Sequence, residues 1–123
     1  MKRIIPDTNV LLAIVEFKTD IFGELRRICD FPYKVYLLEA VLDELEKIKN
    51  TQHGKEQRTA KLVLQILKTK KLPLLQGRGY ADTLLQQHSR AGDFVITQDV
   101  GLKRELTRPY LTIRQKKTLV LVR

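Results

Sequence analysis

Short runs of apolar residues alternate along the chain with longer segments in which apolar residues recur every three or four positions, the spacing of an amphipathic helix. The short runs end at polar or turn-forming residues and have the length of buried strands. Strands that alternate with helices are typical of βαβ units and a parallel sheet. The pattern predicts strands at residues 3–5, 33–38, 72–76, 94–97, 110–114 and 118–122, and helices at residues 10–16, 21–29, 40–49, 58–70, 81–89 and 100–106.

These elements predict an α/β fold with three α/β/α layers and a central, twisted, mostly parallel sheet of about five strands. The last two strands are separated by Lys116 and Lys117 and can form an antiparallel hairpin at the sheet edge. The polar stretch 50–57 is predicted to be a loop, and the helix after it is predicted to bury a stripe through Leu62 and Ile66. At 123 residues, without a repeat or linker, the chain is expected to form a single domain, 1–123.

The composition indicates a soluble globular protein, with 43% hydrophobic and 30% charged residues. No apolar run has membrane-spanning length, and no signal sequence is recognisable at the start. The single cysteine, Cys29, excludes an internal disulfide and is expected to pack in the core. We therefore expect a cytoplasmic protein with no membrane association.

The charge balance narrows the class of partner. Lys and Arg number 23 and Asp and Glu 14, a net charge of +9. Such an excess favours a polyanionic partner such as nucleic acid, because binding it releases counterions. Surface ion pairs in a heat-stable protein are the alternative.

Acidic residues stand at the carboxyl ends of the predicted strands. Asp7 follows the first strand and Asp99 the fourth, each directly before a helix, and Asp82 lies near the start of the helix 81–89. Each position suits a helix N-cap or the helix dipole, so each acid alone has a structural explanation. In open parallel sheets, however, ligands bind outside the carboxyl ends of the strands.

Glu44 is an acid of a different kind. It follows Val41 by three residues and precedes Ile48 by four, so it is expected to share the apolar face of its helix. A carboxylate on a buried face is costly unless it is paired with a base or bound to a cation. An arginine partner is the alternative to a cation.

Together, Asp7, Glu44, Asp82 and Asp99 predict a cation site at one edge of the sheet. Carboxylates in one cleft repel one another and raise one another's pKa values, and a hard divalent cation relieves this repulsion. Mg²⁺ or Mn²⁺, as one or two ions, is expected there. Such sites cleave phosphodiesters, which also gives the basic surface a purpose.

The ordered set of motifs resembles the PIN domain family. The motifs that carry this resemblance are Asp7-Thr8-Asn9 after the first strand, "VLDELEKI" around Glu44, "ADTLL" around Asp82 and "VITQD" ending at Asp99. The resemblance covers nearly the whole chain and is closest to stand-alone PIN proteins of the rRNA-processing (Fcf-like) kind, with VapC toxins more distant. It implies a metal-dependent ribonuclease with a small parallel sheet.

The resemblance also implies roles for individual residues. The four acids would bind the metal, Asn9 would orient ligands or substrate, and Thr97 would place its hydroxyl beside the attacking water. That water would attack phosphorus in line and leave a 5′-phosphate and a 3′-hydroxyl. The position two residues after Asp99, acidic in many members, is Gly101 here, which leaves fewer ligands for a second metal.

The same resemblance implies the partners: an RNA substrate, a second copy of the chain in a homodimer, and an antitoxin or a ribosome-assembly partner.

Tyr80 could stack on a base or pack against its helix. His53 and His88 are the only histidines, which argues against a histidine-based ribonuclease, and both are expected to be ordinary surface residues. The basic residues expected to contact RNA are Lys55, Arg58, Arg78, Lys103 and Arg104.

Three other classes fit the sequence less well. A PIN-like module that binds RNA or protein without cutting it need not keep all four acids. A phosphoacceptor signalling domain needs an aspartate after the third strand, where Gln76 and Gly77 stand, and a second acid beside Asp7. A small-molecule phosphatase also lacks its second aspartate.

Overall fold

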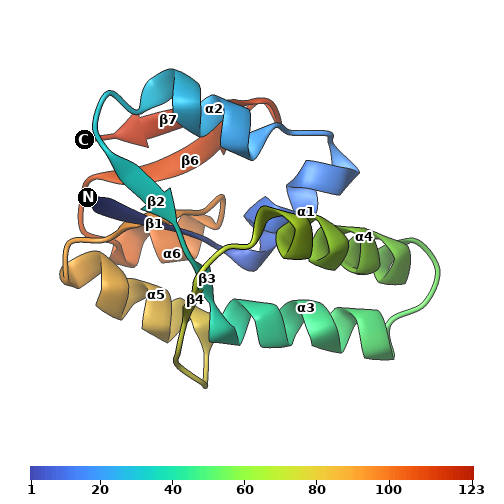
Figure 1. The fold of residues 1–123 in the computed structure, drawn as a ribbon. Coiled ribbons are helices and arrows are strands. Elements are labelled where there is room, and N and C mark those ends of the chain that lie inside the picture. The colour runs from blue at the N-terminus through green and yellow to red at the C-terminus, as the bar shows by residue number, and fades with distance from the viewer.

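The computed structural model describes residues 1–123, which form a sheet between two layers of helices (Figure 1). The five-stranded sheet has the order β2-β1-β5-β6-β7, parallel except for the antiparallel pair β6–β7. The strands are β1 (Lys2–Pro6), β2 (Tyr33–Val35), β5 (Phe94–Ile96), β6 (Tyr110–Arg114) and β7 (Thr118–Val122). The helices are α1 (Thr8–Glu16), α2 (Ile21–Ile28), α3 (Glu39–Thr51), α4 (Lys55–Lys70), α5 (Ala81–Arg90) and α6 (Val100–Glu105). The predicted α/β/α architecture and the terminal hairpin are confirmed.

Alternation along β1 builds the two cores. Ile4 and Ile5 are both fully buried and point to opposite faces, as successive residues of a strand must. Ile4 packs in a cluster with Leu25 of α2, and Ile5 packs in a cluster with Leu45 of α3 and Leu85 of α5. Figure 1 shows α2 on one side of the sheet and α3 and α5 on the other.

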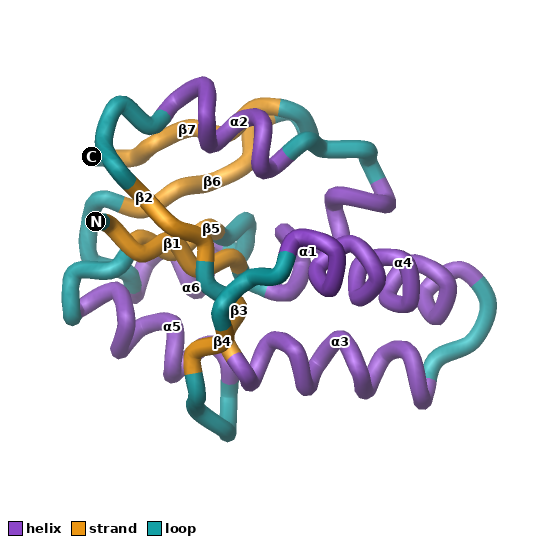
Figure 2. The backbone as a smooth tube through the Cα atoms, viewed as in Figure 1, coloured by secondary structure: helices purple, strands orange, loops and turns teal.

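The segment 33–38 is two strands rather than the single strand predicted. The Tyr36 N–H still bonds to the Ile4 carbonyl at 2.9 Å, but the Leu37 N–H turns to the Pro73 carbonyl at 2.9 Å. The chain therefore leaves the main sheet before α3 begins. β3 (Leu37–Leu38) pairs only with β4 (Leu74–Leu75), so the predicted strand 72–76 lies outside the main sheet (Figure 2).

The buried stripe of α4 differs from the predicted one. Leu62 is 48% exposed, and Ile66 is only partly buried. Ala60, Val63 and Leu67 face the core instead, because α4 packs against both α1 and α3 through this side. The loop before α4 is also shorter than predicted, since α3 runs to Thr51 and α4 starts at Lys55. At 16 residues α4 is the longest helix, and no helix has both the length and the apolar character needed to cross a membrane.

Candidate active site

Asp7 stands where β1 passes into α1. Its N–H bonds to the Ile96 carbonyl of the neighbouring strand at 2.9 Å, so the backbone is still part of the sheet. Its Oδ1 accepts the Thr8 N–H at 2.7 Å and caps α1, which is why this helix starts two residues earlier than the apolar pattern predicts. The residue is only 7% exposed. Asp7 is thus both a cap and a buried carboxylate.

Thr97 lies directly beside Asp7 on the adjacent strand. The parallel register pairs Pro6 with Ile96, so Asp7 and Thr97, which directly follow these two residues, lie side by side. The Thr97 hydroxyl donates to Asp7 Oδ2 at 3.0 Å and accepts the Asp99 N–H at 3.1 Å. Thr97 is completely buried, and its single hydroxyl holds the Asp7 carboxylate in place.

Asp99 is exposed and caps α6. Its Oδ1 accepts the Leu102 N–H at 3.0 Å, which leaves Oδ2 without a hydrogen bond from the protein. A Cβ added at Gly101 would come within 3.2 Å of that same Oδ1. An acidic side chain at position 101 would therefore crowd the Asp99 carboxylate.

Glu44 is exposed, and the prediction that it shares the buried stripe of α3 is wrong. Val41 and Leu45 fill that stripe, and Glu44 lies at its edge, about 100° around the helix from Leu45. Its Oε2 nevertheless accepts a hydrogen bond from the buried Thr8 hydroxyl. Sequence reasoning missed Thr8, although a hydroxyl directly after a strand-end aspartate was a signal for it.

Asp82 occupies the first turn of α5 and is exposed. No side chain caps this helix, and the negative charge of Asp82 in its first turn interacts favourably with the helix dipole. Its charge raises the pKa of Asp7, as does that of Glu44. α5 therefore brings a third carboxylate near Asp7.

Burial is the main cause that raises the pKa of Asp7. Hydrogen bonds from the Thr8 N–H and the Thr97 hydroxyl lower it, and the charges of Asp82 and Glu44 raise it further. No lysine, arginine or histidine forms an ion pair with Asp7, Glu44, Asp82 or Asp99. The negative charge around Asp7 is therefore not compensated within the chain.

This donor set fits a hard divalent cation. Carboxylate and hydroxyl oxygens are the ligands that such ions take, and the uncompensated charge supplies the attraction. No three acidic, histidine or cysteine side chains stand close enough together to enclose an ion by themselves. A cation here would therefore depend on water or substrate oxygens for part of its coordination, as Mg²⁺ commonly does.

Asn9 is exposed and lines a hollow of about 290 Å³ together with Asp99. The hollow also holds Glu16 and Phe17 of the α1 end and Gln98 of the β5–α6 connection. Asn9 and Asp99 thus border the same hollow, and Glu16 adds a carboxylate that the sequence motifs do not indicate. This hollow offers polar groups to a ligand beside Asp99.

The basic residues predicted to contact RNA form no ion pair with Asp7, Glu44, Asp82 or Asp99. Arg78 has an 82% exposed side chain, and its Nε lies 3.7 Å from Glu39 Oε2. Glu39 Oε1 also accepts the Gly77 N–H at 3.2 Å, which ties the loop before Asp82 to the start of α3. Tyr80 in the same loop is 85% exposed and does not pack against its helix. Lys55 and Arg58 begin α4, and Lys103 and Arg104 lie in α6 after Asp99.

The two histidines differ from each other. His53 is exposed, as predicted. His88 is partly buried, and its Nδ1 lies 3.0 Å from Asp93 Oδ2, so the prediction of an ordinary surface residue is wrong for it. Asp93 also accepts two hydrogen bonds from Arg3, which explains why this end of α5 is held to the sheet.

Comparison with known proteins shows the family to which the chain belongs. The family model described as "PIN like domain" matches residues 4–116. Ribonuclease VapC4 of Methanocaldococcus jannaschii is 30% identical over 95% of this chain and 94% of its own length. Ribonuclease VapC9 of Archaeoglobus fulgidus is 33% identical over 80% of this chain and 71% of its own length.

Solved structures share the fold. The PIN domain endonuclease Utp24 aligns with a TM-score of 0.77 at 22% identity, covering 98% of this chain and 91% of Utp24. VapBC2 from Rickettsia felis, bound to a DNA fragment from its promoter, aligns with a TM-score of 0.55 at 12% identity, covering 85% of this chain and 92% of the matched chain.

Proposed function

Because the chain belongs to the PIN-like domain family, we propose that it is an endoribonuclease that hydrolyses RNA phosphodiester bonds with Mg²⁺ or Mn²⁺. One observation carries the proposal. The carboxylates around buried Asp7 have no basic partner in a chain that holds 23 lysines and arginines. The two ribonucleases that are similar over most of this chain support it.

The proposed site divides its tasks among neighbouring residues. Asp7, Glu44, Asp82 and Asp99 would hold one or two cations together with water or substrate oxygens, because no three of these side chains enclose an ion by themselves. A divalent cation there supplies a lowered pKa for an attacking water and charge neutralisation on the phosphoryl oxygens. Thr97 fixes the direction of the Asp7 carboxylate through its 3.0 Å hydrogen bond.

Two further residues complete this assignment. Thr8 holds Glu44 toward Asp7. Asn9, beside Asp99, would orient the substrate. No side chain is needed as a nucleophile, which agrees with the absence of a histidine from the group.

Substrate binding is assigned to basic residues that precede Asp82 or follow Asp99 in the chain, and to two basic residues at the start of α4. Arg78 and Tyr80 lie in the loop directly before Asp82, where a cation and an aromatic ring can meet an RNA strand. Lys103 and Arg104 follow Asp99 on α6. Lys55 and Arg58 lie at the far end of the α3–α4 pair, so they would meet the strand away from the cleaved bond.

We also propose that the protein acts in the cytoplasm as a homodimer, with an antitoxin or a ribosome-assembly factor as partner. The similarity to two VapC ribonucleases supports the antitoxin. The shared fold of Utp24 does not choose between the two partners. Sedimentation equilibrium of the purified chain tests the dimer, and a monomer at all concentrations would contradict it.

The experiment that tests the activity is a cleavage assay on an unstructured RNA. We expect cutting with Mn²⁺ or Mg²⁺, loss of cutting with EDTA, and loss of about a hundredfold or more in Asp7→Asn. Lys117→Gln, at the β6–β7 turn, is the matched control and should cut normally. Undiminished cleavage by Asp7→Asn would remove the assignment. RNA binding without cutting in Mn²⁺ would identify a non-cleaving module.

A further inference from the structure

A hollow with a volume of about 580 Å³ lies between α3 and α4. Its floor is made of leucine side chains from both helices, from β3 and from the segment 72–74 that follows α4. One of them, Leu74, is 46% exposed although it belongs to a strand. We call this feature the α3–α4 groove; its apolar residues are Leu37, Leu42, Leu64, Leu67, Leu72 and Leu74.

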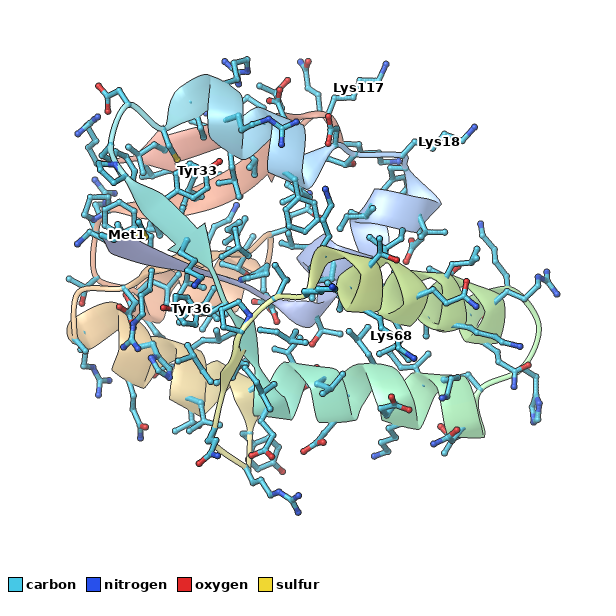
Figure 3. The ribbon with its side chains drawn as sticks, viewed as in Figure 1. Met1, Lys18, Tyr33, Tyr36, Lys68 and Lys117 are labelled. Atoms are coloured by element: carbon cyan, nitrogen blue, oxygen red, sulfur yellow. The ribbon has the colours of Figure 1, made fainter.

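The rim of the α3–α4 groove is basic. Its lysines are Lys49, Lys61, Lys68 and Lys71, and its only acid is Glu46. Lys49 is paired with Glu46 at 3.0 Å, whereas the other three lysines form no ion pair. Figure 3 shows Lys68 between the α3 and α4 ribbons. An apolar floor is thus flanked by free positive charges.

The groove is separate from the candidate active site. Leu42 and Glu46 of α3 line the groove, and Glu44 lies between them in the sequence. Two residues along a helix correspond to a rotation of about 200°, so Glu44 faces away from the groove. A ligand in the groove therefore need not touch the acids.

We propose that the α3–α4 groove is a docking site for an acidic amphipathic helix of a partner protein. Such a helix places its apolar residues on the leucines and its glutamates or aspartates on the free lysines. An RNA backbone would leave the exposed Leu74 and the partly exposed Leu42, Leu64 and Leu72 without an apolar partner. A second copy of this chain, with net charge +9, would bring lysines toward lysines.

The test uses a defined probe. It is a fluorescent synthetic peptide of about 16 residues, roughly 24 Å long as a helix, with leucines at helical spacing and glutamates beside them. A peptide of the same composition in scrambled order is the control ligand. We expect saturable binding of the helical peptide by fluorescence anisotropy and binding at least about tenfold weaker for the scrambled one.

Protein variants locate the binding. Lys61→Glu with Lys68→Glu should weaken the peptide about tenfold, because it reverses two rim charges. Lys34→Glu with Lys117→Glu makes the same change in net charge away from the groove and should bind normally. Leu74→Gln, at an exposed position, should weaken binding severalfold without unfolding the chain.

Several results would overturn the proposal. These are equal binding of both peptides, no saturable binding, or equal weakening by both pairs of lysine variants. Displacement of the peptide by an RNA oligonucleotide would identify a nucleic-acid surface instead. Peptide-driven dissociation of a dimer would identify a second copy as the occupant. Peptide binding is measured without RNA cleavage, so its outcome is independent of the proposed nuclease activity.

Discussion

Asp7 carries a charge in a place where charge is costly. Its carboxylate is nearly inaccessible to water, and two other carboxylates lie close enough to repel it. Two hydrogen bonds, from the Thr8 N–H and the Thr97 hydroxyl, offset part of that cost. The buried charge of Asp7 therefore lowers the stability of the fold, and it attracts positive charge to the site.

The cost of this buried charge predicts that Asp7→Asn changes the stability of the metal-free protein in a pH-dependent way. Burial raises the pKa of Asp7 in the folded state above its ordinary value of 3.8. At pH values between the unfolded-state pKa and the folded-state pKa, the folded chain therefore binds more protons than the unfolded chain. The parent therefore loses stability as the pH rises through this range. We expect the variant to match the parent near pH 3 and to melt about 3 °C higher at pH 7.

Thermal unfolding followed by circular dichroism in EDTA measures this difference. Asp43→Asn, an exposed acid on α3, serves as the control and should show no such trend. A variant less stable than the parent at pH 7 would mean that the two hydrogen bonds outweigh burial.

Thr8 predicts a second effect at this scale. Thr8→Val keeps the shape of the buried side chain and removes the hydrogen bond that holds Glu44. We expect Mn²⁺ to bind about tenfold more weakly, as is usual when a group that orients a ligand is lost. Mn²⁺ titration followed by calorimetry measures it, and Thr8→Ser should restore most of the affinity. Equal affinity in the valine variant would show that Glu44 needs no such support.

At the scale of the elements, Asp93 joins three of them. It lies just before β5, accepts two hydrogen bonds from Arg3 of β1, and lies 3.0 Å from His88 of α5. The pairing raises the pKa of Arg3. Because Arg3 is 41% exposed and Asp93 only 10%, the pair is intermediate between a surface and a buried ion pair.

Asp93→Asn should therefore destabilise the fold by about 2 kcal/mol, between the values for exposed and buried pairs. Urea unfolding measures the change. Glu46→Gln breaks the exposed Glu46–Lys49 pair and should cost less than about 0.5 kcal/mol. Equal effects of the two substitutions would show that the Asp93 interactions add nothing beyond a surface pair.

The element scale also shows what the sequence could and could not predict. Alternating strands and helices were predictable because each has its own period of apolar residues, and the strand-end positions of Asp7 and Asp99 followed from them. The break between β2 and β3 could not be predicted, because Val35, Tyr36 and Leu37 are all residues that favour a strand. The exposure of Leu62 depends on which neighbours α4 packs against, and the tie of Glu44 to Thr8 depends on side-chain directions.

At the scale of the whole molecule, opposite charges are separated. The net charge is +9, yet the acids around Asp7 have no basic partner. Long-range attraction would bring a polyanion to the surface, while only a bound cation allows it to approach the acids. RNA binding and RNA cleavage should therefore respond to different substitutions.

Arg78→Gln tests this separation. The residue is exposed in the loop before Asp82, so its loss should raise KM severalfold, leave kcat nearly unchanged, and lower the slope of log affinity against log salt by about 1. Steady-state cleavage and RNA binding at several salt concentrations measure these quantities. Lys117→Gln, at the β6–β7 turn where Figure 3 places it, should leave all three unaltered. A fall in kcat would place Arg78 among the reacting groups.

The strand order has a consequence for synthesis of the chain. β1 is bordered by β5, and the hydroxyl that holds Asp7 comes from Thr97, 90 positions later. A chain emerges from the ribosome N-terminus first, so a nascent chain that ends before β5 carries Asp7 without the residues that complete its surroundings. If the protein cuts RNA as proposed, its nascent chain remains inactive until the segment that carries Thr97 has been made and has folded.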